Sequence, residues 1–291
     1  MSMPRSENVD SHQRKWRWIR RSWTVVANVW QRLGDHNTSV LAAAVAFYSF
    51  LSIFPAIAAL VSLYGLIANP NDLSNELNTL QAVVPTEVLS PLSDWLTNLV
   101  HKPRTNFGLG LVISLALSIW SARYATATLM TALDVAYGIP EQRTFLLYNA
   151  VALLLTLLLI IFVSFAMALV AILPALIGFL PLPSAWQSGL LWIRWPMLLM
   201  IIVVAVGLLY RFAPNRSHSG WEFGSAGALL AVLGLAGGSY CFSLYISAFA
   251  AYDKTYGSLG AVAVLLTWLW IAAYFVLAGA ELNAEIAADP S

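Results

Sequence analysis

The sequence predicts an all-α fold: a polytopic membrane protein with six transmembrane helices and an N-terminal amphipathic interfacial helix. Three observations predict this class. Of the 291 residues, 59% are hydrophobic and only 10% are charged, whereas soluble domains carry about 25% charged residues. The formal net charge is only +1, so no global field favours a nucleic-acid partner. The single cysteine, Cys241, excludes a disulfide-stabilised scaffold.

Six long apolar stretches predict the transmembrane helices, because about 20 apolar residues are needed to cross the hydrocarbon core of a bilayer. One charge, Arg123, interrupts the second stretch. The third is expected to end before Pro174, since proline breaks the helical hydrogen-bond pattern. The predicted spans cover approximately residues 42–67, 106–133, 146–173, 192–212, 223–250 and 259–280.

The chain is predicted to have three parts. Residues 1–35 make a basic, tryptophan-rich cytoplasmic arm, residues 36–286 the six-helix transmembrane domain, and residues 287–291 a short cytoplasmic tail. Most of the 15 lysines and arginines lie in the arm and in the loops after the second and fourth spans. Because basic loops stay in the cytoplasm, both termini are predicted to be cytoplasmic. The loop at about 68–106 is then external and is expected to form short amphipathic helices. No signal peptide is predicted.

The arm shows a repeated apolar pattern. Trp16, Trp23 and Trp30 recur every seven residues, and an apolar residue follows three positions after each. On a helix these positions form one stripe beside the basic residues. This predicts a helix lying flat on the membrane and binding anionic lipids. A regulatory or partner-binding arm is an alternative. RNA binding is disfavoured, because the aromatic residues are not spaced for stacking bases.

Ionisable residues at membrane depth are costly and indicate function by default. Arg123 and Asp134 lie about three turns apart on one predicted helix, too far for a direct pair. Arg123 is either a buried structural charge or part of a substrate or ion path. Glu281 and Glu285 share one helix face at the end of the sixth span. They either hold a cation or a proton, or mark where the helix leaves the membrane.

The first span contains polar residues next to a proline. Pro55 removes one backbone hydrogen bond, and Tyr48, Ser49 and Ser52 precede it within two turns. A helix kinked there would expose carbonyl groups and hydroxyls. Such a helix is a candidate wall for a cavity, although the same arrangement is also a common packing device.

Glycine is frequent in the fifth span. Gly234 and Gly238 form a small-xxx-small pair, and Ala231 lies one turn earlier. Small residues at this spacing let two helices approach closely. We expect a packing face, either within the fold or between the subunits of a homo-oligomer.

No enzyme motif is recognisable. The four histidines never occur at one-turn spacing, and the chain has no HExxH, Walker, GxGxxG or GxSxG pattern. We therefore expect no catalytic residues, no metal site, no cofactor and no enzymatic activity.

Several segments, in this order along the chain, resemble the YihY/BrkB family of bacterial inner-membrane proteins. They are AAAVAFYSFLSIFP at 42–55, YG at 137–138 followed by Arg143, LYRFAPNR at 209–216, FSLY at 242–245, YGSLGA at 256–261 and GAELNAE at 279–285. The resemblance implies a six-helix, multi-pass protein of the bacterial inner membrane. Family members carry the labels "ribonuclease BN", regarded as a misassignment, and "virulence factor", and their activity is poorly defined.

These observations favour a transporter- or permease-like protein for an ion, a small solute or a lipid. The alternative is a non-transporting envelope scaffold or virulence-associated membrane component; ribonuclease activity is disfavoured. The candidate transport path consists of Tyr48, Ser49, Ser52, Pro55, Arg123, Asp134, Tyr256, Glu281 and Asn283.

Overall fold

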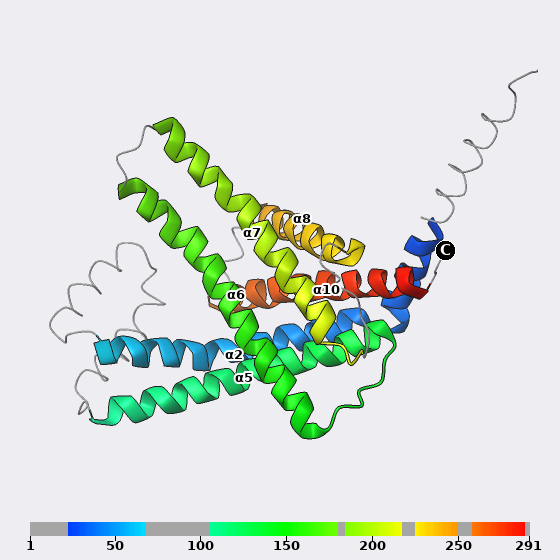
Figure 1. Ribbon diagram of the computed structural model, residues 1–291, viewed down its shortest axis with the longest axis horizontal. Helices are drawn as coiled ribbons and strands as arrows, with labels where there is room; N and C mark the ends of the chain where they lie inside the picture. The colour runs from blue at the N-terminus through cyan, green and yellow to red at the C-terminus, as the bar shows by residue number, and fades with distance from the viewer. Residues whose placement is uncertain (1–22, 68–104, 180–183, 217–224, 249–257, 289–291) are drawn as a thin grey trace, which may run out of the picture. The chain divides into compact units, whose positions relative to one another are not determined.

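The computed structural model describes residues 23–67, 105–179, 184–216, 225–248 and 258–288. These residues form helices and connecting turns, with no β-strand among them, so the predicted all-α fold is confirmed. The external loop predicted at 68–106 and most of the arm lie outside the described residues. In chain order the helices are Trp23–Asp35, α2 (Thr38–Ile67), α5 (Thr105–Tyr137), α6 (Phe145–Phe179), α7 (Ser184–Phe212), α8 (Ala226–Ala248) and α10 (Ser258–Ala288) (Figure 1).

Each of the six predicted spans coincides with one of the long helices α2 to α10. By length and composition, four helical stretches in the described part of the chain could cross a membrane on their own. A fifth is reached if Trp23–Asp35 and Thr38–Phe54, which meet at 60°, count as one span. The described residues therefore contain four to five candidate membrane spans, and the six predicted spans are not confirmed. The four are Phe145–Ala166, Gly189–Phe212, Ala226–Ser247 and Gly260–Ala288.

Proline does not end the third long helix where the sequence predicts. Pro174 was expected to stop the helix, but α6 continues to Phe179. Likewise α7 begins at Ser184 and passes through Pro196. Proline is tolerated inside long apolar helices because neighbouring helices and side chains satisfy the freed backbone groups. The predicted break at Pro174 is wrong.

A turn at Asn37 separates the N-terminal helix from α2. Asn37 has a φ of 50°, a left-handed conformation that asparagine adopts more readily than most residues. Its N–H donates to the Gly34 carbonyl at 3.0 Å, and its own carbonyl accepts from the N–H of Val40 at 2.9 Å. One residue thus closes the first helix and opens the second, which accounts for the 60° bend.

A Schellman motif ends α5. Gly138 has a φ of 65°, and its N–H donates to the Val135 carbonyl at 3.0 Å. The N–H of Ile139 donates to the Asp134 carbonyl at 2.9 Å. This pair of bonds satisfies carbonyls that the helix end would leave open, and Pro140 follows directly, where the helix cannot continue.

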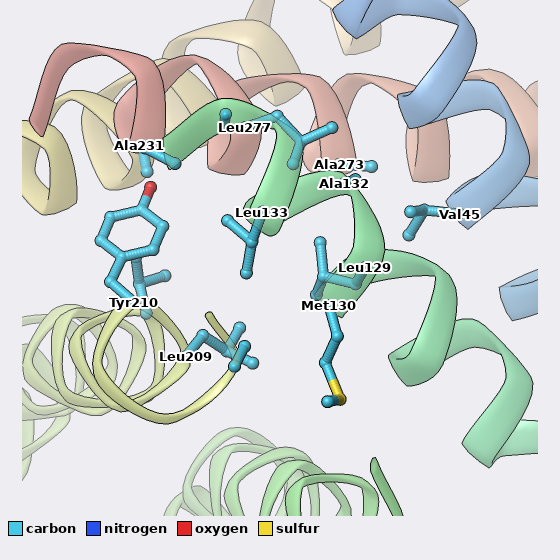
Figure 2. Close-up of a cluster of buried hydrophobic side chains, with 14 of the residues drawn as sticks. Val45, Leu129, Met130, Ala132, Leu133, Leu209, Tyr210, Ala231, Ala273 and Leu277 are labelled. Atoms are coloured by element: carbon cyan, nitrogen blue, oxygen red, sulfur yellow. The ribbon is translucent and has the colours of Figure 1, made fainter. Parts of the chain in front are cut away.

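The chain divides into two compact units, residues 1–47 with 126–291, and residues 48–125. The first unit contains a hydrophobic core to which all six long helices contribute. Many of its members are alanines, so the helices approach closely around a few large side chains. Figure 2 labels Val45, Leu129, Met130, Ala132, Leu133, Leu209, Tyr210, Ala231, Ala273 and Leu277 of this core.

Helix α8 packs against α10 through its glycines. A Cβ atom added at Gly227 would run into the carbonyl oxygen of Gly279, and one added at Gly234 into the ring of Phe275. At Gly238 an added Cβ would lie 2.7 Å from the same ring. The glycine stripe predicted in the fifth span therefore packs within the chain, which was one of its two expected roles.

We predict that Gly227→Ala lowers the free energy of unfolding by about 1–3 kcal/mol, because the new methyl group meets backbone that cannot move aside. Gly237→Ala is the matched control, since no described atom lies within 4 Å of a Cβ added there. It should leave stability unchanged or slightly raised, as alanine favours helix. The measurement is thermal unfolding of the purified variants in one detergent. Equal stability of the two variants would contradict the close packing of α8 on α10.

Candidate functional site

The most buried charge in the described residues is Glu281 on α10, whose side chain is 0% exposed. Two side chains of the N-terminal segment reach it. Arg32 Nε donates to Glu281 Oε2 at 2.9 Å, and His36 Nδ1 lies 2.6 Å from Glu281 Oε1. Both carboxylate oxygens therefore have partners, which a buried carboxylate requires.

Arg32 makes further contacts that extend this group. Its Nη1 lies 3.4 Å from Glu285 Oε2, and its Nη2 donates to the Ala136 carbonyl at 2.9 Å. Asn28 Nδ2 donates to the other oxygen of Glu285 at 2.7 Å. We call Asn28, Arg32, His36, Glu281 and Glu285 the Glu281 cluster. Arg32 thus connects the N-terminal helix to α10 and to the end of α5. A cation is stabilising at that end, because the carbonyl end of a helix carries partial negative charge.

The sequence contained a signal for this cluster. Arg32 and His36 are four residues apart, as are Glu281 and Glu285, so each pair lies on one helix face. The side chains of the first face can therefore bind the two carboxylates of the second. Arg32 belongs to the basic arm in the sequence, and nothing local brings His36 and Glu281, which lie 245 residues apart, into contact.

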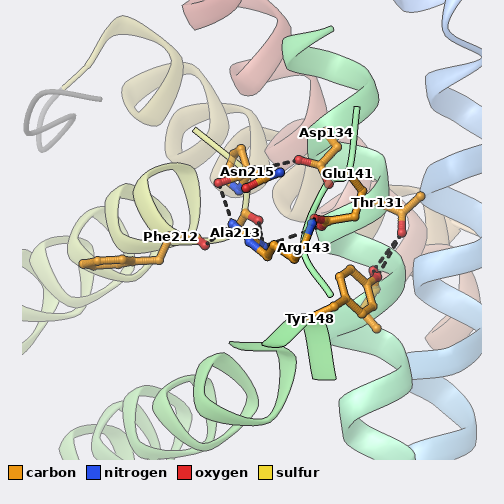
Figure 3. A network of polar contacts seen from close by, with 10 residues as sticks. Thr131, Asp134, Glu141, Arg143, Tyr148, Phe212, Ala213 and Asn215 are labelled. Carbon is orange, nitrogen blue, oxygen red and sulfur yellow. Dashed lines mark hydrogen bonds and ion pairs between the residues drawn. The ribbon is translucent and has the colours of Figure 1, made fainter. Parts of the chain in front are cut away.

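A second polar group surrounds the end of α7 (Figure 3). Arg143 donates to three successive carbonyls, those of Phe212 at 3.4 Å, Ala213 at 3.0 Å and Pro214 at 2.8 Å. The last carbonyls of a helix have no partner within it, so the guanidinium caps α7. In the same group Asp134 Oδ1 accepts from the N–H of Asn215 at 2.9 Å. Asp134 thus secures the turn after α7.

Arg216 also contacts residues near the end of α7. Its guanidinium lies 3.7 Å from the ring centroid of Tyr137, a cation–π distance. Its Nη2 donates to the Tyr210 carbonyl at 3.2 Å, and the hydroxyl of Tyr210 donates to the Val276 carbonyl at 2.6 Å. The segment 209–216 at the end of α7 is therefore held by contacts to α5 and α10.

Asn283 joins α10 to the start of α8. Its Oδ1 accepts from the N–H of Gly227 at 2.8 Å, and its Nδ2 donates to Ser225 Oγ at 2.9 Å. Ser225 Oγ also accepts from the N–H of Ala228 at 3.1 Å, as an N-cap residue does. The buried amide thus satisfies a helix N-terminus that would otherwise lack partners.

In the second unit, Arg123 is only 6% exposed. Its guanidinium lies 4.7 Å from the Trp120 ring centroid and 4.4 Å from that of Tyr124. The Nε of Arg123 has no hydrogen-bond partner among the described residues. Tyr48 stacks on Tyr124 at a centroid distance of 6.2 Å. We call Tyr48, Trp120, Arg123 and Tyr124 the Arg123 cluster.

The predicted path residues therefore fall into separate surroundings. Tyr48 and Arg123 share Tyr124 as a neighbour, whereas Glu281, Asp134 and Asn283 each have the partners described above. In α2, Ser52 Oγ donates to the Ser49 carbonyl at 2.7 Å. Pro55 lies within α2, and Tyr256 lies outside the described residues. No three His, Cys, Asp or Glu side chains in the described ranges are grouped as metal ligands would be.

We predict that Glu281→Gln lowers the free energy of unfolding by about 2 kcal/mol, because it leaves Arg32 and His36 facing a neutral group. Arg32 is 26% exposed, so solvent reduces the loss below that for a fully buried pair. Glu285→Gln, which removes only a longer and more exposed contact, should cost less than about 1 kcal/mol. Thermal unfolding of both variants, of Arg32→Gln and of the Arg32→Gln/Glu281→Gln double variant measures the coupling. Strictly additive effects of the two changes would show that the pair contributes nothing.

Comparison with known proteins relates the chain to membrane proteins of bacteria. It is 27% identical over 255 residues to the ribonuclease-like protein YfkH of Bacillus subtilis, covering 86% of this chain and 90% of that protein. A UPF0761 membrane protein of Idiomarina loihiensis is 25% identical over 262 residues, which is 88% of both chains. A UPF0761 membrane protein of Xanthomonas oryzae is 26% identical over 286 residues. That alignment covers 95% of this chain but only 64% of the Xanthomonas protein. No solved structure matches.

The family described as Virulence factor BrkB matches residues 29–290. This range contains the end of α7, the Arg123 cluster and all of the Glu281 cluster except Asn28. Because the match extends over far more than half of the chain, and relatives along its length are membrane proteins, this protein belongs to the BrkB family of membrane proteins.

Proposed function

We propose that this chain is a permease-like protein of the bacterial inner membrane that moves an ion, a small solute or a lipid, and that it is not an enzyme. Its family and its apolar helices support the membrane location. The ribonuclease-like name of the Bacillus relative suggests phosphodiester cleavage. In this chain, however, the carboxylates of Glu281 and Glu285 are occupied by Arg32, which leaves them poorly suited to act as a general acid or base.

The observation that carries the transport proposal is the Arg123 cluster. A cation in the middle of a long apolar helix is expensive and persists where it has a task. Trp120 and Tyr124 offset part of that cost by cation–π attraction. They leave the Nε of Arg123 without a hydrogen-bond acceptor among the described residues. A guanidinium with an unused donor favours an anionic group.

We further propose six spans, with both termini in the cytoplasm. Each of the six long helices has at least 23 residues, or roughly 34 Å, which exceeds the thickness of the hydrocarbon core. The N-terminal helix Trp23–Asp35 would then lie along the membrane surface. Its Trp23 and Trp30 are 71% and 77% exposed and Val26 lies on the same side, so the helix presents one apolar face away from the Glu281 cluster.

Reporter fusions test the number of spans, because an even number puts both ends of the chain on one side. We predict that green fluorescent protein fluoresces at either terminus, and that alkaline phosphatase is active when inserted within residues 68–104 and inactive at the C-terminus. Five spans would place the two termini on opposite sides. An active phosphatase at the C-terminus would therefore contradict the proposed topology.

Flux into proteoliposomes tests the transport proposal. We expect purified protein to carry at least one of chloride, phosphate, protons or a fluorescent anionic lipid. Arg123→Gln should lower that flux at least about tenfold, equivalent to ~1.4 kcal/mol, and Arg123→Lys should retain part of it. The matched control is Arg194→Gln on α7, whose guanidinium also lies over a tryptophan ring, that of Trp195.

Thermal unfolding of each reconstituted variant shows whether it is folded. Flux that is absent for every solute class, or that Arg123→Gln leaves at the wild-type level, would remove the support for a permease. A loss of equal size in Arg194→Gln would show that the effect is not specific to the Arg123 cluster.

A further inference from the structure

A cavity of about 440 Å³ lies within the first unit, between the start of α6 and the end of α7. Its lining combines two kinds of surface. Three arginines contribute positive charge: Arg143, Arg211 and Arg216. The rest is apolar and comes from α6, with Phe212 and Pro214 from the end of α7. A site that is cationic at one end and apolar along its wall suits an amphipathic molecule with an anionic group and a hydrocarbon part.

The apolar wall follows one face of α6. Val151, Leu154, Leu155 and Leu158 have the spacing i, i+3, i+4 and i+7, which is a continuous stripe on a helix. Seven residues at 1.5 Å each extend roughly 10 Å along the helix axis. The stripe is therefore long enough to accompany the first several carbons of an acyl chain. Leu154 is 68% exposed, so the wall is open to the surrounding lipid.

Each of the three guanidinium groups has contacts with carbonyls or aromatic rings. Arg143 is bound to the carbonyls at the end of α7, Arg216 lies on the Tyr137 ring, and Arg211 lies 5.4 Å from the ring centroid of Phe212.

None of the described residues that line the cavity is acidic. Two carboxylates come near without lining it: Glu141, 3.7 Å from Arg143 Nη1, and Asp134, which binds Asn215. The described lining of the cavity is therefore cationic, which attracts anions.

We propose that this cavity is a binding site for an anionic phospholipid, with the phosphate at the arginines and the upper part of one acyl chain along α6. Arginine forks match phosphate oxygens, and basic pockets between membrane helices are typical sites for anionic headgroups. A zwitterionic lipid would bring a cation to the same rim. A soluble phosphate would leave the 10 Å apolar wall unused. The site stands on the cavity alone and does not depend on transport activity.

Native mass spectrometry of the full chain in detergent, with equal amounts of phosphatidylglycerol and phosphatidylcholine, tests the site. Wild-type protein should retain phosphatidylglycerol in preference to phosphatidylcholine. Arg211→Gln should weaken retention of phosphatidylglycerol roughly fivefold, the contribution of one cation near an anionic lipid. Leu154→Trp should weaken it as well, by filling the apolar wall.

Two matched controls accompany these variants. Arg194→Gln removes an arginine from the same helix α7 but from outside the cavity lining, and Leu153→Trp adds the same ring one residue away on α6. Both should retain phosphatidylglycerol as the wild type does. Thermal unfolding shows which variants are folded, and if Arg211→Gln is not, Leu154→Trp still decides.

Three results would overturn the proposal. The first is equal retention of the two lipids by the wild type. The second is a loss in Arg194→Gln or Leu153→Trp as large as that in Arg211→Gln or Leu154→Trp. The third is competition by glycerol phosphate at the same concentration as phosphatidylglycerol, since the apolar wall would then contribute nothing.

Discussion

The negative charge of Glu281 is the constraint on which the arrangement of the first unit depends. A carboxylate that is 0% exposed is tolerated only with close cationic or hydrogen-bonding partners. Those partners, Arg32 and His36, lie at the other end of the chain. The N-terminal helix must therefore stay against α10, and Arg32 also fixes the end of α5 through the carbonyl of Ala136. Three helices are positioned by one buried ion, around which the alanine-rich core closes.

Three other polar residues of this unit also connect helices, each by binding backbone groups at or next to a helix end. Arg143 caps the carbonyl end of α7, and Asn283 caps the N–H end of α8. Asp134 binds the turn that follows α7. In an apolar protein each unsatisfied backbone group is costly, so long-range side chains replace the water that caps helix ends elsewhere. These contacts explain why the segments that resemble the BrkB family contain polar residues. Not all of these residues need to line a transport path.

Local sequence was sufficient to place the six long helices and to find the glycine face, because apolar length and small-residue spacing are local properties. It failed at Pro174, where α6 continues to Phe179 although proline lacks the donor of one helical hydrogen bond. It also failed to join Arg32 and His36 to Glu281, since their contact depends on how distant helices pack. Arg123 was singled out correctly as a buried charge, but its position between Trp120 and Tyr124 follows from side-chain conformations that spacing alone does not determine.

The contact between Arg32 and Glu281 spans 249 residues, and this separation has a consequence for biosynthesis. During translation the helix Trp23–Asp35 is made well before α10, so Arg32 has no Glu281 to pair with until α10 leaves the ribosome. The Glu281 cluster therefore forms only once α10 has been made, whatever order the intervening helices follow. A chain stopped before residue 281 would leave Arg32 without the carboxylate that it binds in the folded protein.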